Sequence, residues 1–81
     1  MKASVEISMY PLTEAFGTPI LQFIGRLRQY EGLTVQSNNI STQVFGEYDE
    51  VMEALTSEMK GVFEEEKTVV MVMKVLNLDL R

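Results

Sequence analysis

The sequence of 81 residues contains no cysteine, no histidine and no tryptophan. The lack of cysteine excludes disulfides, thiolate metal sites and a cysteine nucleophile. The lack of histidine removes the commonest general base and the commonest zinc ligand, so histidine-based triads and zinc-dependent hydrolysis are also excluded. We therefore expect a protein that is not an enzyme, with no catalytic residues, no metal site and no cofactor.

Basic residues are scarce as well, with seven Lys and Arg against twelve Asp and Glu and a formal net charge of −5. Because nucleic-acid binding depends mainly on contacts of Lys and Arg with phosphate, nucleic acid is not an expected partner. No apolar run approaches the ~18 residues of a membrane-spanning helix, and the N-terminus has the pattern of a strand rather than of a signal peptide. We expect one cytoplasmic domain over residues 1–81, without membrane insertion.

Alternation of apolar and polar residues predicts four strands, over residues 3–10, 33–37, 40–47 and 68–76. Pro11 ends the first strand because it offers no amide to a ladder, and residues 12–17 are expected to form a short loop. Asn38 and Asn39 tolerate positive φ and predict a tight hairpin between the second and third strands. The last strand is apolar on both faces, so we expect both of its faces to be buried.

Apolar residues three and four positions apart predict two helices, over residues 19–30 and 49–63. Thr18 is expected to cap the first helix, with Pro19 in its first position, where a missing N–H costs nothing. Gly32 is expected to end that helix in a left-handed conformation. Asp49 is expected to cap the second helix, and residues 64–67 are expected to form a solvated turn.

The predicted order of elements is β-α-β-β-α-β. Two right-handed crossovers joined by a hairpin give an α+β fold of the ferredoxin-like type, a four-stranded antiparallel sheet with both helices on one face. The usual spatial order of the strands in this fold is 4-1-3-2, which places the first and third strands in the middle.

Two helices can cover only one side of such a sheet. The other side is expected to carry Glu6, Ser8, Tyr10, Ser41, Gln43 and Phe45, with an apolar row from the last strand. Small monomers rarely leave a large apolar surface uncovered, and a domain of this size has a thin core. We therefore expect self-association into a homo-oligomer, a dimer or a tetramer.

Polar residues beside apolar walls also suit a small polar ligand, which needs water excluded and a few groups to orient it. Composition alone favours a simpler interpretation, in which Ser8 and Ser41 are ordinary strand residues with cross-strand contacts. In the same way, Tyr10 can be an interface ring with its hydroxyl at the wet rim, and Glu6 an exposed or interface charge.

Three segments, Ser8–Thr13, Asn39–Gly46 and Tyr48–Met52, together resemble the YkoF-like family of thiamin- and hydroxymethylpyrimidine-binding proteins. The patterns S-x-Y-P-[LM]-T and I-S-T-x-[VL]-x-G occur in that order, on the predicted first and third strands. The resemblance implies a ferredoxin-like fold, no catalysis, and binding of thiamin or its pyrimidine moiety. In the namesake type two such domains lie in one chain, so here a homodimer would have to supply the second copy.

The resemblance carries a set of ligand-binding candidates onto this sequence. Ser8 and Tyr10 come from the first motif, and Ser41 and Thr42 from the second. Strand geometry adds three neighbours, Glu6, Asn38 and Gln43. Alternation places Thr42 on the helix side, opposite Ser41. A pocket that uses both must therefore lie at a strand end, unless the strand bulges.

Three functions remain open. The first is a non-enzymatic binding protein for thiamin or a hydroxymethylpyrimidine-type ligand, working as a homo-oligomer. The second is a self-associating regulatory or assembly module with no ligand of its own, using the uncovered face only for pairing. The third is a cofactor-free monooxygenase of the dimeric ferredoxin-like kind, which the absence of His, Cys, Trp and paired acids disfavours.

Overall fold

The computed structural model describes residues 1–12, 14, 17–66 and 68–81. The elements are β1 (Lys2–Pro11), α1 (Gly17–Leu27), β2 (Thr34–Ser37), β3 (Thr42–Glu47), α2 (Tyr48–Glu65) and β4 (Val69–Leu76). Parts of the expected loop over 12–17 and of the expected turn over 64–67 lie outside the described residues.

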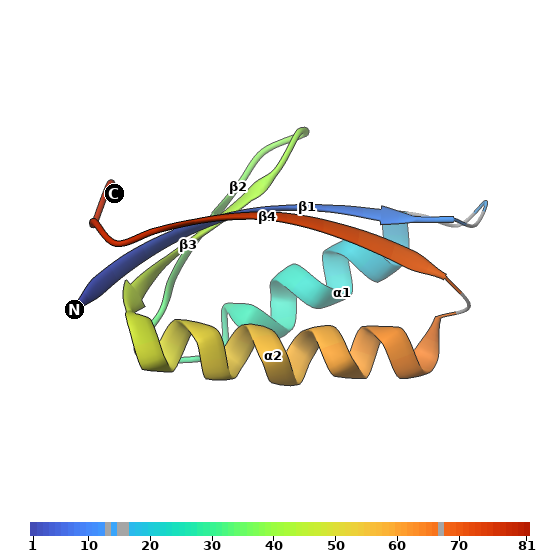
Figure 1. Ribbon diagram of the computed structural model, residues 1–81. Coiled ribbons are helices and arrows are strands. Elements are labelled where there is room, and N and C mark those ends of the chain that lie inside the picture. The colour runs from blue at the N-terminus through green and yellow to red at the C-terminus, as the bar shows by residue number, and fades with distance from the viewer. Residues whose placement is uncertain (13, 15–16, 67) are drawn as a thin grey trace.

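The sheet has the order β2-β3-β1-β4, and all neighbouring strands are antiparallel. Figure 1 shows both helices on one side of this sheet, with α2 running beneath β1 and β4. The ferredoxin-like α+β prediction is therefore confirmed, with β1 and β3 in the middle of the sheet. We call the side without helices the open face.

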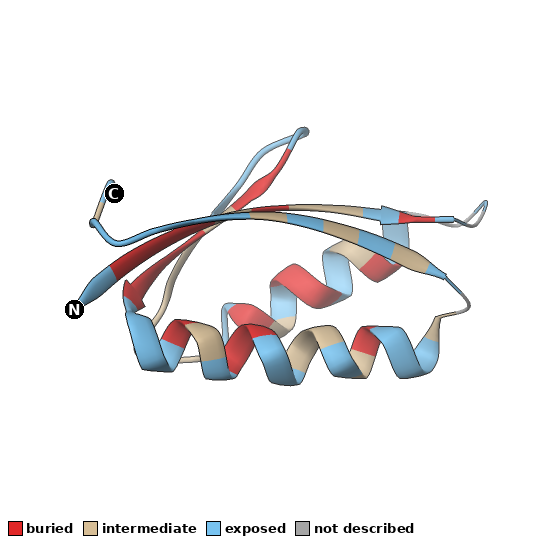
Figure 2. Cartoon of the chain, viewed as in Figure 1, coloured by how far each residue is buried: buried red, intermediate tan, exposed pale blue. Residues whose placement is uncertain are grey.

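The core lies between the sheet and the helices. Its buried members come from both central strands and both helices: Val5, Ile7, Phe23, Leu27, Val44, Val51, Ala54, Leu55 and Val62. The edge strand β4 contributes only one face to it, and Figure 2 shows no buried residue along β4. The expectation that both faces of this strand are buried is therefore wrong within the protomer. No helix covers its second face, where Val70 and Val72 are exposed.

The boundaries of α1 differ from the prediction. The helix begins at Gly17, so Thr18 is not its cap and Pro19 is not its first residue. It ends at Leu27 rather than at residue 30, because the amides of the next turn bond to the carbonyl three residues earlier instead of four residues earlier. Tyr30 N, for example, donates to the Leu27 carbonyl at 3.2 Å. No described residue has a positive φ, so the left-handed stop expected at Gly32 is also wrong.

The turn between β2 and β3 is longer than the predicted two-residue hairpin. It contains residues 38–41, again without positive φ. The Asn38 side chain takes the place of the expected turn geometry: its Oδ1 accepts hydrogen bonds from the backbone N of Ile40 at 2.8 Å and of Ser41 at 2.9 Å. Ile40, expected on a strand, therefore lies in the turn and is exposed.

The start of α2 is held by the first two residues of the chain. Tyr48 N donates to the Met1 carbonyl at 2.9 Å, so the helix begins at Tyr48 with Glu47 as its N-cap, and the expected cap at Asp49 is wrong. Asp49 lies in the first turn, where a negative charge still interacts favourably with the helix dipole. The Lys2 ammonium, 3.0 Å from Glu47 Oε1, lowers the pKa of that carboxyl.

After β4 the chain turns onto the open face (Figure 1). The Ser4 hydroxyl donates to the Leu78 carbonyl at 2.5 Å and accepts from Leu80 N at 3.0 Å. Arg81 Nη1 donates to Thr34 Oγ1. We call residues 77–81 the C-terminal segment. Because this segment lies on the open face, a second copy that packed there would contact the segment as well as the strands.

Candidate functional site

The sheet separates at one end of the β1–β3 ladder. β1 pairs with β3 from Lys2–Glu47 to Ile7–Thr42 and no further, whereas it pairs with β4 on to Pro11–Val69. Residues 8–11 therefore have a strand neighbour on one side only. The β2–β3 hairpin diverges from β1 at this point, as Figure 1 shows, and leaves a gap between the end of β1 and the turn 38–41.

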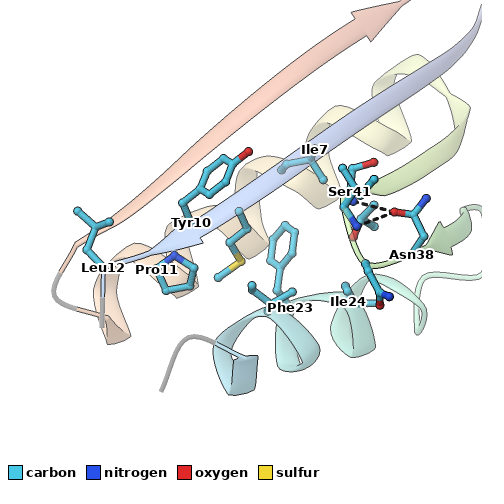
Figure 3. Close-up of a pocket in the computed structure, with 13 residues that line it drawn as sticks. Ile7, Tyr10, Pro11, Leu12, Phe23, Ile24, Asn38 and Ser41 are labelled. Carbon is cyan, nitrogen blue, oxygen red and sulfur yellow. Dashed lines mark hydrogen bonds between the residues drawn. The ribbon is translucent and has the colours of Figure 1, made fainter. Parts of the chain in front are cut away.

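A cavity of about 410 Å³ lies at this separation, and we call it the strand-end cavity. It is bounded by the end of β1, the first half of α1 and the β2–β3 turn (Figure 3). Its lining consists of Ile7, Met9, Tyr10, Pro11, Leu12, Ile20, Phe23, Ile24, Asn38, Asn39, Ile40, Ser41 and Thr42. None of these residues carries a formal charge at neutral pH, so the cavity suits a group without a formal charge that is oriented by a few polar contacts.

The cavity meets β1 at its edge rather than at one of its faces. Successive residues of a strand point to opposite faces, yet Met9, Tyr10 and Pro11 all contribute to the lining. Figure 3 shows the Tyr10 ring on the opposite side of β1 from Phe23. The ring is about half exposed, at 53%, and lies on the open-face side of the rim.

Asn38 and Thr42 supply polar groups to the cavity. Thr42 faces the helix side, as strand alternation predicts, and is only 6% exposed. Its hydroxyl has no hydrogen-bond partner within the described part of the chain. Every fully buried polar side-chain atom there does have a partner, so the Thr42 hydroxyl must be accessible to solvent. Asn38 uses its oxygen inside the turn, which leaves its Nδ2 group available as a donor.

Ser41 reaches both sides of the sheet. Its backbone lies at the strand-end cavity, but its hydroxyl belongs to the open face, where it donates to Glu6 Oε2 at 3.0 Å. Gln43 Nε2 donates to the same hydroxyl at 2.8 Å, and Lys74 Nζ lies 3.4 Å from Glu6 Oε1. A continuous polar row therefore crosses the open face from Gln36 to Lys74.

A second cavity, of about 390 Å³, lies on the open face where the C-terminal segment crosses the sheet. Its lining combines this polar row with apolar side chains: Ser4, Val5, Glu6, Gln36, Gln43, Phe45, Lys74, Leu76 and Leu80. Phe45 is only 5% exposed although it faces away from the helices. The C-terminal segment, through Leu80, therefore covers part of the open face within one protomer.

The structure divides the predicted site residues between these two places. Tyr10, Asn38, Ser41 and Thr42 line the strand-end cavity, whereas Glu6 and Gln43 line the cavity on the open face. Ser8 lines neither cavity and stands opposite Val72 of β4. Thr13, the last residue of the first motif, lies outside the described residues. Their role in binding stays a prediction.

Sequence reasoning missed the helix wall of the strand-end cavity, formed by Ile20, Phe23 and Ile24. Their three- and four-residue spacing predicts a helix with one apolar face, but the spacing itself cannot say whether a sheet strand or an opening lies against that face. Ile40 was missed as well because it was assigned to a strand. Its large exposure, 85%, marks it as a rim residue.

Neither a metal centre nor a membrane-spanning helix was found in the described ranges. No group of three or more Asp or Glu side chains there is arranged to hold a metal ion. No described helix combines the length and the apolar character needed to cross a membrane.

Several solved structures share the fold of this chain. Protein SP2199 from Streptococcus pneumoniae is 27% identical, with a TM-score of 0.88 over 99% of this chain and 90% of that chain. Protein MJ1052 from Methanocaldococcus jannaschii is 23% identical, with a TM-score of 0.81 over 99% of this chain and 84% of its own. TM0486 from Thermotoga maritima, whose given name proposes a role in thiamine biosynthesis or salvage, is 20% identical, with a TM-score of 0.82 over 100% and 85% of the two chains. The two likenesses below 25% identity show the fold alone.

No curated protein matches the chain significantly. The model of the YKOF-related family, in contrast, matches residues 2–76, from the start of β1 to the end of β4. This range contains both motifs from which the resemblance was drawn, and it contains every described residue that lines the strand-end cavity. The chain therefore belongs to the YKOF-related family.

Proposed function

We propose that this protein binds a small molecule without transforming it, and that the ligand is thiamin or a hydroxymethylpyrimidine-type compound held in the strand-end cavity. The proposal includes a homo-oligomer formed through the open face and a cytoplasmic location. The observation that carries it is the cavity itself, which lies where the two sequence motifs meet and has an uncharged, mostly apolar lining with a few convergent polar groups.

The chemistry of the lining supports a pyrimidine. Apolar side chains from α1, among them Phe23 and Ile24, form an apolar wall of the cavity against which a planar ring can pack. The Thr42 hydroxyl can donate or accept, and the Asn38 Nδ2 group can donate to a ring nitrogen. Thiamin also carries a permanently positive thiazolium, and an aromatic ring that is half exposed at the rim, such as that of Tyr10, can bind a cation through its face.

Membership of the YKOF-related family supports the same ligand class, and so does the role that the name of the Thermotoga maritima protein proposes for that protein. The proposal that the protein is not an enzyme rests on this family and on the absence of histidine and cysteine. The strand-end cavity offers polar groups that orient a ligand, but none of the described residues in its lining is an Asp, Glu or Lys that could act as an acid or base.

Calorimetric titration of the purified chain with thiamin and with hydroxymethylpyrimidine tests the proposal. We expect saturable heat from at least one compound, and binding weakened about tenfold in Thr42→Val, which keeps the shape of the side chain and removes its hydroxyl. Thr56→Val is the matched control, because Thr56 is exposed on α2 and does not line the cavity. No heat with either compound at millimolar concentration would exclude this ligand class.

One observation favours the second candidate, a self-associating module with no ligand. The open face exposes Val70, Val72 and Leu76 of β4, at 45%, 54% and 39%, next to the exposed Tyr10. Exposed apolar rows of this kind commonly mark interfaces. Native mass spectrometry separates the candidates: a small molecule retained on the oligomer supports the binding protein, whereas a ligand-free oligomer that also fails the titration supports the module.

A further inference from the structure

The backbone groups of β1 point alternately to its two neighbouring strands, and two hydrogen bonds establish which residues point where. Leu12 N donates to the Thr68 carbonyl at 3.0 Å, so the even-numbered residues direct their N–H and C=O toward β4. The Met1 carbonyl accepts from Tyr48 N at 2.9 Å, so the odd-numbered residues direct theirs toward β3. Ile7, the last of these with a partner on β3, stands opposite Thr42.

Met9 is the next residue whose N–H and C=O point to the β3 side. The register would place residue 40 opposite it, but the ladder has ended, and the Ile40 amide donates instead to Asn38 Oδ1 at 2.8 Å. The Met9 N–H and C=O therefore have no strand partner within the described residues. Met9 also lines the strand-end cavity, which occupies the place of the missing strand.

Pro11 follows the same alternation. Its nitrogen would point to the side where β3 is absent, so a residue without an N–H costs the sheet no ladder hydrogen bond at this position. The effect is that Met9 holds the one backbone N–H of residues 8–11 that is directed into the opening. A ligand that hydrogen-bonds to this edge of β1 through an acceptor must therefore accept from the Met9 N–H.

We infer that the strand-end cavity recognises its ligand through the backbone of Met9. An extended residue at an unpaired edge presents its N–H and C=O side by side, as it would to a neighbouring strand. A planar heterocycle with a ring-nitrogen acceptor next to an exocyclic amine, which is the edge of a 4-aminopyrimidine, satisfies both groups at once. This inference rests on the proposed function and deepens it, because it assigns the recognition to backbone atoms and to one edge of the ring.

This mode of recognition predicts that binding affinity depends strongly on the exocyclic amine of the ligand. A ligand that keeps the ring nitrogen but has a methyl group in place of the amine leaves the Met9 carbonyl without a donor in a partly dry site. Sites built around such a hydrogen bond discriminate strongly against analogues that lack it. We expect the methyl analogue to bind at least about tenfold more weakly than hydroxymethylpyrimidine.

Amide hydrogen exchange followed by NMR tests the backbone geometry before any ligand is added. In the free protein, the Met9 amide should exchange much faster than those of Ser8 and Tyr10, which are bonded to β4. These two neighbours are the internal controls. A Met9 amide as protected as they are would overturn the inference whatever the protein binds.

The same measurement with saturating hydroxymethylpyrimidine tests recognition. We expect the Met9 amide to become protected about tenfold or more, and a scalar coupling to appear between its nitrogen and an isotope-labelled ring nitrogen. Heat in the titration without protection and without this coupling would overturn the inference and leave the proposed function standing. If thiamin and hydroxymethylpyrimidine both fail to bind, the probes become 4-aminopyrimidine and cytosine: protection of Met9 by either supports the inference alone, and protection by neither overturns it.

Discussion

Arg26 Nε donates a hydrogen bond to Glu58 Oε1 at 2.7 Å and thereby joins α1 to α2. The Tyr30 hydroxyl donates to the other oxygen of the same carboxylate at 2.8 Å. The Glu58 side chain is only 16% exposed, so this ion pair is better shielded from water than a usual surface pair. Because α1 forms one wall of the strand-end cavity, the contact also positions the helix that carries this wall relative to α2.

Glu58→Gln is expected to destabilise the protein by about 1 kcal/mol, because it replaces a charged acceptor of two hydrogen bonds by a neutral amide that can accept only through one oxygen. The value stays low because Arg26 is about one-third exposed and the pair is partly screened. Urea unfolding measures the change. Glu64→Gln, on an exposed part of the same helix, is the control and should leave the free energy of unfolding within about 0.5 kcal/mol.

The hydrogen bond to Glu58 also raises the pKa of the Tyr30 phenol above its usual value, with burial and the charge of Glu58 acting in the same direction. The folded state therefore favours the neutral phenol. Its contribution to stability is complete below the unfolded pKa of about 10 and is lost as the pH rises through the folded pKa. Absorbance titration in a Tyr10→Phe, Tyr48→Phe background, where Tyr30 is the sole tyrosine, should show a raised pKa. Adding Glu58→Gln should lower it, and an unchanged titration would contradict the assigned cause.

The fold could be predicted from the sequence because local patterns decide it. The alternation of Val5, Ile7 and Met9 and the helical spacing of Val51 and Leu55 each report which side of an element is apolar. Six such elements in this order leave few topologies. The helix ends were predicted less well, because the start of α2 depends on a hydrogen bond to Met1, 47 positions earlier in the chain.

The site could be predicted only in part. Alternation correctly placed Thr42 on the helix side and led to a pocket at a strand end if Ser41 takes part as well. The opening itself depends on where β3 leaves β1, and no local pattern reports that point. The Asn38 turn moved Ile40 off the strand, and this tertiary arrangement decides that Met9 lacks a partner. The sequence pattern instead predicts a tight two-residue hairpin at Asn38 and Asn39.

Ser4→Ala is expected to release the C-terminal segment, because the Ser4 hydroxyl bonds both the Leu78 carbonyl and the Leu80 amide. The free energy of unfolding should fall by about 1 kcal/mol, since the freed groups lie near the surface and can bind water. Amide exchange at Leu80 should accelerate about tenfold. Ser8→Ala, a serine on the same face of the same strand, is the control. Unchanged exchange at Leu80 would show that other contacts hold the segment.

Val72→Lys is expected to weaken self-association by about tenfold or more while leaving the protomer folded, because Val72 is 54% exposed on the open face. A two-fold interface there would have to bury the new charge of both copies against apolar side chains. Leu21→Lys is the matched control, since Leu21 is 71% exposed on α1, away from the open face. Sedimentation velocity measures both. Equal weakening by the two variants would place the interface elsewhere than the open face.

Asn38 joins the turn and the cavity, and two substitutions separate its roles. Asn38→Asp keeps the oxygen that accepts from the Ile40 and Ser41 amides, whereas Asn38→Ala removes it. We expect Asn38→Ala to cost about 1 kcal/mol in urea unfolding and Asn38→Asp to cost little.

Both variants lose the Nδ2 donor. If that group donates to the ligand, hydroxymethylpyrimidine should bind about tenfold more weakly to each of them in calorimetry. Normal binding to Asn38→Asp with weakened binding to Asn38→Ala would instead mean that Asn38 acts on the ligand only by holding the turn. In that case the Met9 edge, the Thr42 hydroxyl and the Asn39 amide would have to supply the polar contacts, because the Ser41 hydroxyl is already bonded to Glu6 on the other face.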